Sequence, residues 1–130
     1  NISITNNTIT FITFDSENYD TDTIHSTVTN TGRLTATTAG KYLIIGMVRF
    51  ADSTVGDRQL SIRLNGVTTI AVWGGPPTAG TTVQFTTLVM TEWNMAATDY
   101  VELSVLQNSG GALNVMGGQE ILAFMMRKVG

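Results

Sequence analysis

Residues 40–53 read GKYLIIGMVRFADS, and the ten-residue run Lys41–Phe50 inside them decides the expected fold. Because successive side chains of a β-strand point to opposite faces, this run presents two apolar faces. A sandwich strand normally keeps one face in the core and the other in water. The second apolar face must therefore be covered by something else. The first face carries Tyr42, Ile44, Gly46, Val48 and Phe50, and the second carries Leu43, Ile45, Met47 and Arg49.

The composition of the chain favours a domain that hides surface in an assembly. A length of 130 residues suits one domain with a hydrophobic core. Charged residues make up only 13% of the chain, against about 25% in an ordinary domain. With so few charged residues, a small monomer would expose much uncharged surface to water. Self-association is one way to cover that surface.

Several function classes are disfavoured by the same numbers. The net charge is −3 and the seven basic residues are scattered, so a nucleic-acid partner is not expected. The chain has no cysteine, which excludes disulfides and thiolate metal sites. No signal-peptide pattern opens the sequence, and no apolar run approaches the ~20 residues of a membrane helix, so membrane insertion is not expected.

The chain is rich in Thr, Val and Ile and lacks a sustained helical period, which predicts an all-β fold. Asn65-Gly66 favours a two-residue type I′ hairpin turn, because both residues tolerate positive φ. Regularly spaced short strands predict an antiparallel two-sheet sandwich or jelly roll. The expected strands are Ile9–Phe14, Ile24–Val28, Arg33–Thr37, Lys41–Phe50, Gln59–Leu64, Val67–Trp73, Thr82–Trp93, Tyr100–Leu106 and Ile121–Val129.

The domain boundaries are simple. Residues 9–130 form a single head domain, and residues 1–8 are a candidate tail of an upstream connection. The last expected strand, Ile121–Val129, also lacks a polar face. Either a loop or the N-terminal segment covers the second face of such a strand, or another chain buries it.

The sequence around the opening stretch resembles a known signature. GRLTATTAGKYLIIGMVRF is similar to the jelly-roll superfamily of complement component one q and tumour necrosis factor. That signature has a large apolar residue, five residues, and then Gly-x-Tyr-x-aromatic-x-aromatic. Leu34, Gly40 and Tyr42 fit it, whereas Ile44 and Gly46 stand where the family prefers aromatics.

Two later stretches extend the resemblance, which runs from about Phe14 to the C-terminus. LSIRLNG is similar to the family's next strand and hairpin, and AATDYVELSVLQ to its late Ala-Gly-Asp-x-Val-x-Leu stretch. Asp99, Val101 and Leu103 fit the late pattern, with Thr98 in place of Gly.

The resemblance implies a jelly roll of about ten strands that assembles as a homotrimer. In that family the strand after Gly-x-Tyr and the last strand lie side by side, in the sheet that faces the trimer axis. We expect Tyr42, Ile44, Val48 and Phe50 in the core. The sequence does not separate the two faces of the last strand. The expected trimer interface comprises Leu43, Ile45, Met47, Arg49, Leu122, Phe124 and Met126.

Little in the sequence points to catalysis or to a cofactor. His25 is the only histidine, and no Gly-x-Ser-x-Gly elbow occurs, so no enzyme is expected. Glu92, Glu102 and Glu120 are too isolated to be paired as the carboxylates of a glycan hydrolase.

Two acidic groups are candidates for metal ligands. The first lacks the Gly and Glu that an EF-hand loop requires, and a solvated loop is favoured. Asp52 and Asp57 bracket a second loop, three copies of which a trimer would bring together, so they are weak metal candidates. No motif supports calcium, and no cofactor is expected. The first group comprises Asp15, Glu17, Asp20 and Asp22.

A Gly/Pro-rich segment, residues 74–81, follows Trp73 and is not expected to hold a strand. An exposed Trp beside an adaptable loop is typical of recognition surfaces. Alternatively, Trp73 caps the end of the sandwich. Trp93 is expected in the core. The candidate receptor-contact residues are Trp73, Gly74, Gly75, Pro76, Pro77 and Thr78.

The stretches VGDRQLSIRLNGVTTIAV and TDYVELSVLQNSGGALNV are similar to phage virion proteins. This resemblance implies a non-enzymatic trimeric head of a phage fibre or virion adhesin, which binds a glycan or protein of the host surface. The alternative is a structural trimerisation or decoration domain without a ligand. The implied location is the virion surface, with a bacterial or spore surface, or another extracellular place, as the alternative.

Overall fold

The computed structural model describes residues 1–77 and 85–130, and within them it contains ten β-strands and no helix. No described segment is therefore a helix of the length and apolarity needed to cross a membrane. The strands are β1 (Ile2–Ile4), β2 (Thr10–Phe11), β3 (Arg33–Thr35), β4 (Gly40–Val48), β5 (Arg58–Leu64), β6 (Thr68–Gly75), β7 (Thr87–Met95), β8 (Tyr100–Gln107), β9 (Leu113–Val115) and β10 (Leu122–Lys128).

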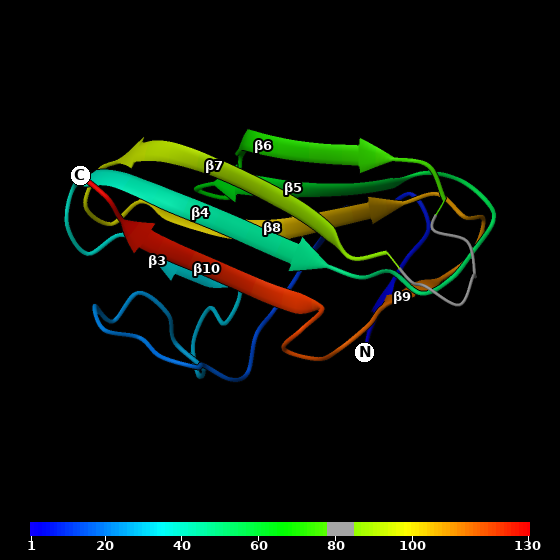
Figure 1. The fold of residues 1–130 in the computed structure, drawn as a ribbon, viewed down its shortest axis with the longest axis horizontal. Helices are drawn as coiled ribbons and strands as arrows, with labels where there is room; N and C mark the ends of the chain where they lie inside the picture. The colour runs from blue at the N-terminus through cyan, green and yellow to red at the C-terminus, as the bar shows by residue number, and fades with distance from the viewer. Residues whose placement is uncertain (78–84) are drawn as a thin grey trace.

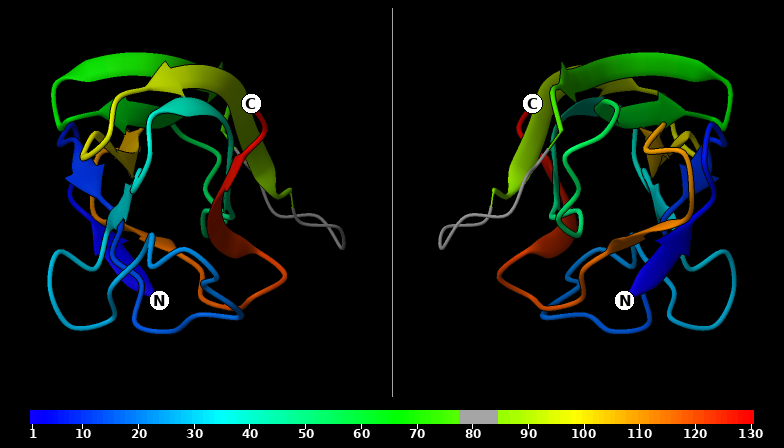
Figure 2. Two further views of the ribbon diagram at one scale, coloured as in Figure 1. Left: turned by 90° about the vertical axis from the view of Figure 1, so that its left-hand side faces the viewer. Right: turned by 90° about the vertical axis from the view of Figure 1, so that its right-hand side faces the viewer.

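The strands form two facing sheets, and every pairing is antiparallel. One sheet has the order β10-β4-β7, and the other has β2-β8-β5-β6 with β3 paired to β8. Strands β1 and β9 make a small third pair. Figure 1 looks onto the β10-β4-β7 sheet, and Figure 2 shows the two layers from the ends of the molecule. The expected all-β antiparallel sandwich of about ten strands is confirmed.

The core lies between the two sheets and uses the predicted face of β4. Tyr42, Ile44, Val48 and Phe50 are buried, as expected from the alternation of the opening stretch. Leu103 of β8 is buried in the same cluster, among side chains of the facing sheet. Alternation thus places one apolar face of β4 in the core and leaves the other outside.

The Asn65-Gly66 hairpin is confirmed, with positive φ of 51° and 74° at the two turn residues. The Asn65 side chain also binds the neighbouring strand end, accepting from the Tyr100 N–H at 3.0 Å and donating to Asp99 Oδ1 at 3.0 Å. The hairpin is therefore tied to the start of β8.

Three strand predictions need correction. Only Thr10–Phe11 of the expected Ile9–Phe14 strand is regular, because the Phe14 N–H turns away to the Thr31 carbonyl. Residues 24–28 form no strand, since the amides of Ile24 and His25 bind the Asp20 carboxylate. Strand β6 continues through Gly75, into the segment where no strand was expected.

Two further expectations change. Residues 2–4, placed in a candidate connection, form β1 and pair with β9, and Ile4 is fully buried in the core. This segment therefore belongs to the folded domain. Trp93 was expected in the core but is 37% exposed, because β7 carries it to the end of the sheet opposite Tyr42.

Candidate binding surfaces

The outer face of the β10-β4-β7 sheet carries an apolar grid. In the register of the sheet, Ile45 lies between Met90 of β7 and Met125 of β10. In the next outward-facing row, Met47 lies between Leu88 and Ala123. Directly opposed side chains of antiparallel strands share a face, so these six side chains form one surface. We call them the outer grid.

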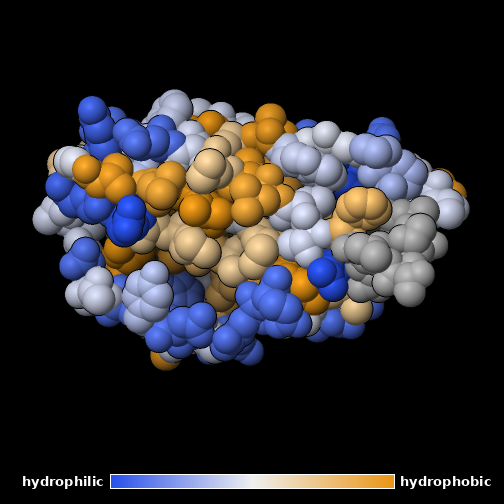
Figure 3. Space-filling model, viewed as in Figure 1, coloured by the Kyte–Doolittle hydropathy of each residue, from blue (hydrophilic) through white to orange (hydrophobic). Residues whose placement is uncertain are grey.

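Three side chains of the outer grid are exposed in the single chain, and Ile45, Met47 and Ala123 are half-buried. Leu88, Met90 and Met125 are 50%, 58% and 45% exposed. Figure 3 shows an apolar band along the middle of this face, with hydrophilic side chains around it. Large contiguous apolar patches with polar rims mark interaction sites in soluble proteins.

Polar side chains lie at both ends of the outer grid. At one end, Leu43 lies between Arg127 and Glu92. At the other, Arg49 is half-buried and donates to Thr86 Oγ1, from Nη2 at 2.8 Å and from Nε at 3.1 Å. The predicted set Leu43, Ile45, Met47 and Arg49 therefore shares one face, and its role in a trimer interface stays a prediction.

The predicted face of the last strand is wrong. Leu122, Phe124 and Met126 lie opposite the inward-facing residues of β4 and pack against the core. The outward-facing residues of β10 are instead Ala123, Met125 and Arg127, by the same register. Both faces of β10 are apolar, so alternation alone could not distinguish them. Pairing with β4 decides the matter.

The candidate receptor loop is only partly accessible. Trp73 lies on the inner face opposite Leu60 and packs against the core, as the alternative reading expected. Its ring covers Gly75, where a Cβ would lie 2.7 Å from the ring carbons. Gly74 and Pro76 are exposed, Pro77 is half-buried, and Thr78 lies outside the described residues.

The buried side chain of an arginine, Arg58, organises the loop that contains Asp52 and Asp57. Arg58 is 1% exposed, and its guanidinium donates to the backbone carbonyls of Val55 and Asp57, each at 3.0 Å. Burial lowers the pKa of Arg58, and the neighbouring Asp57 carboxylate opposes that shift. A fixed positive charge beside Asp57 disfavours a metal cation there. No group of three or more possible metal-binding side chains occurs within residues 1–77 and 85–130.

The acidic loop is ordered by its own polar groups. Asp20 accepts hydrogen bonds from the backbone N–H groups of Ile24, at 2.9 Å, and His25, at 3.0 Å. His25 lies 2.8 Å from Glu17 Oε1 through Nδ1 and 2.8 Å from the Thr31 carbonyl through Nε2. Two members of the acidic group, Asp20 and Glu17, thus stabilise the conformation of their own loop.

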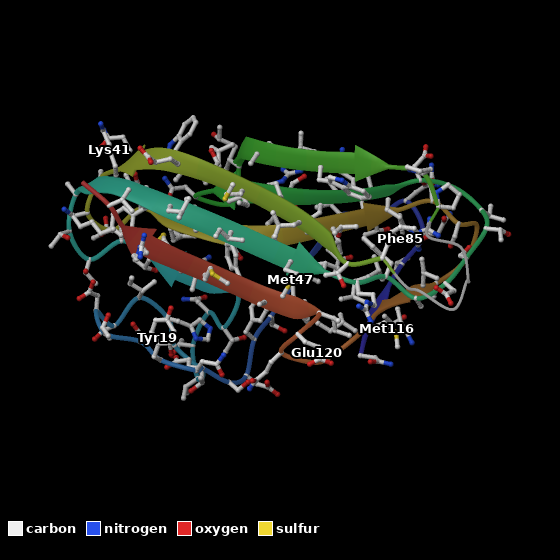
Figure 4. The ribbon with its side chains drawn as sticks, in the orientation of Figure 1. Tyr19, Lys41, Met47, Phe85, Met116 and Glu120 are labelled. Atoms are coloured by element: carbon white, nitrogen blue, oxygen red, sulfur yellow. The ribbon has the colours of Figure 1, made fainter. Side chains whose placement is uncertain are left out.

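A cavity of about 220 Å³ lies between this loop and β10, and sequence reasoning missed it. Leu122, Phe124 and Met126 line one side, and residues 16–21 line the other. The rings of Phe14 and Phe124 stack within it, with centroids 6.1 Å apart. Figure 4 places Tyr19 on the loop below β10. The only sequence feature that could have indicated the cavity is the apolar inner face of β10. The sequence alone instead places that face in the trimer interface.

Comparison with known proteins identifies the fold. No protein-family model and no curated protein matches the chain. Among solved structures, Eiger TNF from S. frugiperda aligns with a TM-score of 0.62 and 11% identity, over 97% of this chain and 90% of that one. The fold is therefore a TNF-like jelly roll, as the resemblance in the sequence implied.

Two carbohydrate-binding modules are more distant. The module CBM6cm-2 of a Cellvibrio mixtus lichenase, in complex with cellotriose, is 21% identical over 75% of this chain and 66% of that one, with a TM-score of 0.39. Xyl-CBM35, in complex with a glucuronic acid containing disaccharide, is 17% identical over 98% and 97%, with a TM-score of 0.38. Likeness at this level carries no argument about function.

Proposed function

We propose that this chain is a non-enzymatic binding head that works as a homotrimer, at the end of a phage fibre or as a virion adhesin. It binds a glycan or protein of the host surface. The observation that carries the proposal is the exposed outer grid on a TNF-like jelly roll. Assembly through the grid would cover this apolar face of a chain in which only 13% of the residues are charged.

The composition of this face suits an interface between copies of the chain. A rotational ring needs two different patches on each copy, so that each copy contacts the next until the ring closes. The grid supplies an apolar centre, and Arg49, Arg127 and Glu92 supply a polar rim of both signs. Protein–protein interfaces commonly combine an apolar core with a polar rim in this way.

The self-association is tested with a matched pair of variants. Ile45→Glu puts a charge at the centre of the outer grid. Val72→Glu puts the same charge on β6, at a side chain that is 57% exposed outside the grid. Sedimentation velocity at micromolar concentration should give a trimer for the parent and for Val72→Glu, and a folded monomer for Ile45→Glu. A monomeric parent, or a trimer that ignores Ile45→Glu, overturns the assignment.

The virion setting rests on the sequence resemblance to phage virion proteins. Three copies of a weak site raise avidity without stronger individual contacts. Gly74 lies in the last part of β6 and Pro76 follows that strand, and these two exposed residues are the accessible part of the candidate contact surface.

A purely structural trimerisation or decoration domain is the second candidate. The packing of Trp73 against the core favours it, since the one aromatic of the candidate loop is thereby engaged in the fold. The two functions differ in what the isolated trimer binds.

Host binding separates them. The purified trimer is applied to host cells and glycan arrays, together with a variant in which residues 76–81 are replaced by Gly and Ser. The control is Val67→Glu, which changes a side chain 78% exposed at the opposite end of β6. An adhesin loses binding on loop replacement and keeps it in the control. A trimer that binds neither cells nor glycans is structural.

A further inference from the structure

Strand β10 is an edge strand with an unpaired side. Among the described residues, β4 is its only neighbour in the sheet. Along an antiparallel pair, successive residues turn their N–H and C=O groups alternately toward and away from the partner. The Val129 N–H donates to the Lys41 carbonyl, which sets the phase of the pairing. Phe124 and Met126 therefore turn their backbone groups to the free edge.

The usual protection of an edge strand is missing over this stretch. Natural edges carry Lys, Pro or a bulge that prevents another strand from pairing. Residues 122–126 read LAFMM, and the register with β4 is regular throughout. The basic residues Arg127 and Lys128 come only at the end of the strand.

The cavity opens beside this same edge. The side chains of Leu122, Phe124 and Met126 line it, and their backbone groups face the edge. Its opposite wall carries the carboxylates of Glu17 and Asp20 together with His25, and none of the described residues that line it is a Lys or Arg. The site thus offers backbone hydrogen bonds, an apolar floor and negative charge.

We propose that the free edge of β10 binds an extended peptide strand of a partner protein, which alternates apolar residues with Lys or Arg. The peptide continues the sheet beyond β10. Its inward side chains enter the cavity, and its basic side chains lie near the acidic loop. This binding goes beyond the proposed adhesin function and uses the free edge and inner face of β10, whereas the outer grid uses the outer face of that strand.

The chemistry of the edge favours a peptide over other occupants. Its backbone groups recur every second residue, about 7 Å apart, and only another strand matches that spacing with donors and acceptors. A lipid or small apolar molecule could fill the cavity and would leave these groups unpaired. A second copy paired through β10 would bring two acidic loops together, and their like charges disfavour that arrangement.

The wall of the site is already in place before a ligand arrives. Asp20 holds the loop through two backbone amides, and His25 links Glu17 to the Thr31 carbonyl. A fixed wall reduces the ordering that binding requires, which favours affinity.

The test uses three synthetic seven-residue peptides with blocked ends. The first alternates Val and Lys, the second alternates Val and Glu, and the third repeats the first with N-methylated backbone amides on one edge. Titration is followed by heteronuclear NMR and by amide hydrogen exchange. The Val/Lys peptide should slow exchange at Phe124 and Met126 by tenfold or more at saturation. Exchange at Ala123 and Met125, already paired with β4, should not change.

The comparison peptides identify the contacts. N-methylation removes edge hydrogen bonds and should weaken binding about tenfold or more. Equal binding of the methylated peptide overturns strand addition, and equal binding of the Val/Glu peptide overturns the electrostatic part. Exchange protection at Phe124 and Met126 that grows with concentration in the Ile45→Glu variant, in the absence of peptide, would make a second copy the occupant and overturn the proposal.

A pair of variants tests the edge on the protein side. Met126→Pro removes an N–H that faces the free edge and leaves the bonds to β4 in place. Met126→Ala removes the same side chain and keeps the N–H. Stronger loss of Val/Lys peptide binding in Met126→Pro supports the proposal, and equal loss overturns it. Should Met126→Pro fail to fold, the methylated peptide still decides.

Discussion

Asp20 shows how one carboxylate shapes the loop that walls the cavity. Burial of its carboxyl raises the pKa, but hydrogen bonds from the backbone of His25, Ile24 and Asp22, together with the nearby His25 ring, outweigh burial and hold the pKa below its ordinary value. A carboxyl whose pKa is lowered on folding stabilises the fold at pH values above its unfolded pKa. That contribution is lost as the pH falls through the lowered, folded value.

The loop should therefore loosen in acid. Below about pH 4, where unfolded aspartates gain protons, we expect the amide NMR signals of Ile24 and His25 to shift as Asp20 is protonated. Asp20→Asn, which keeps only one acceptor oxygen, should loosen the loop already at neutral pH and cost about 1 kcal/mol in free energy of unfolding. Asp15→Asn, in the same loop, is the control. Unchanged amide signals in Asp20→Asn would contradict this account of the loop.

At the scale of the elements, β4 meets the facing sheet at Gly46. A Cβ at this position would overlap Leu103 Cδ1, a buried side chain of β8. Leu103 therefore occupies the space that any larger side chain at position 46 would need.

Gly46→Ala should destabilise the fold by about 1–3 kcal/mol, because an added methyl group overpacks the core. Leu103→Val in the same chain makes room and should recover part of the loss. Urea unfolding of the two single variants and the double variant gives the coupling energy. Simple additivity of the two changes would show that Gly46 and Leu103 do not compete for space.

The elements also show what could be predicted from the sequence. Strict alternation in β4 predicts its core face correctly, and Asn65-Gly66 predicts its hairpin, because both signals are local. The faces of β10 could not be predicted, since both are apolar and only register with β4 distinguishes them. The short pair β1 and β9 was missed, because strands of three residues leave no periodic pattern.

The candidate site escaped prediction for a related reason. The cavity forms where the loop of Glu17 and Asp20 meets Phe124, about a hundred residues further along the chain. Sequence analysis recognised the acidic loop and the apolar strand separately. Nothing local in either segment indicates that they face each other.

At the scale of the whole molecule, folding and self-association become one equilibrium. If the outer grid is buried only in the trimer, folded chains bind one another and unfolded chains do not. Mass action then stabilises the fold as concentration rises. For a trimer that unfolds to single chains, each tenfold rise contributes about 1 kcal/mol per chain, which corresponds to a shift of a few degrees in melting temperature.

The melting temperature of the parent should therefore rise by a few degrees for each tenfold increase in protein concentration. Ile45→Glu, with a charge among Met90 and Met125, should melt at a lower temperature that does not depend on concentration. Val72→Glu should keep the dependence of the parent. Calorimetry over a hundredfold range of concentration measures all three proteins. A parent whose melting temperature is the same throughout that range would mean that its fold is complete without neighbours, and the exposed outer grid would then need another explanation.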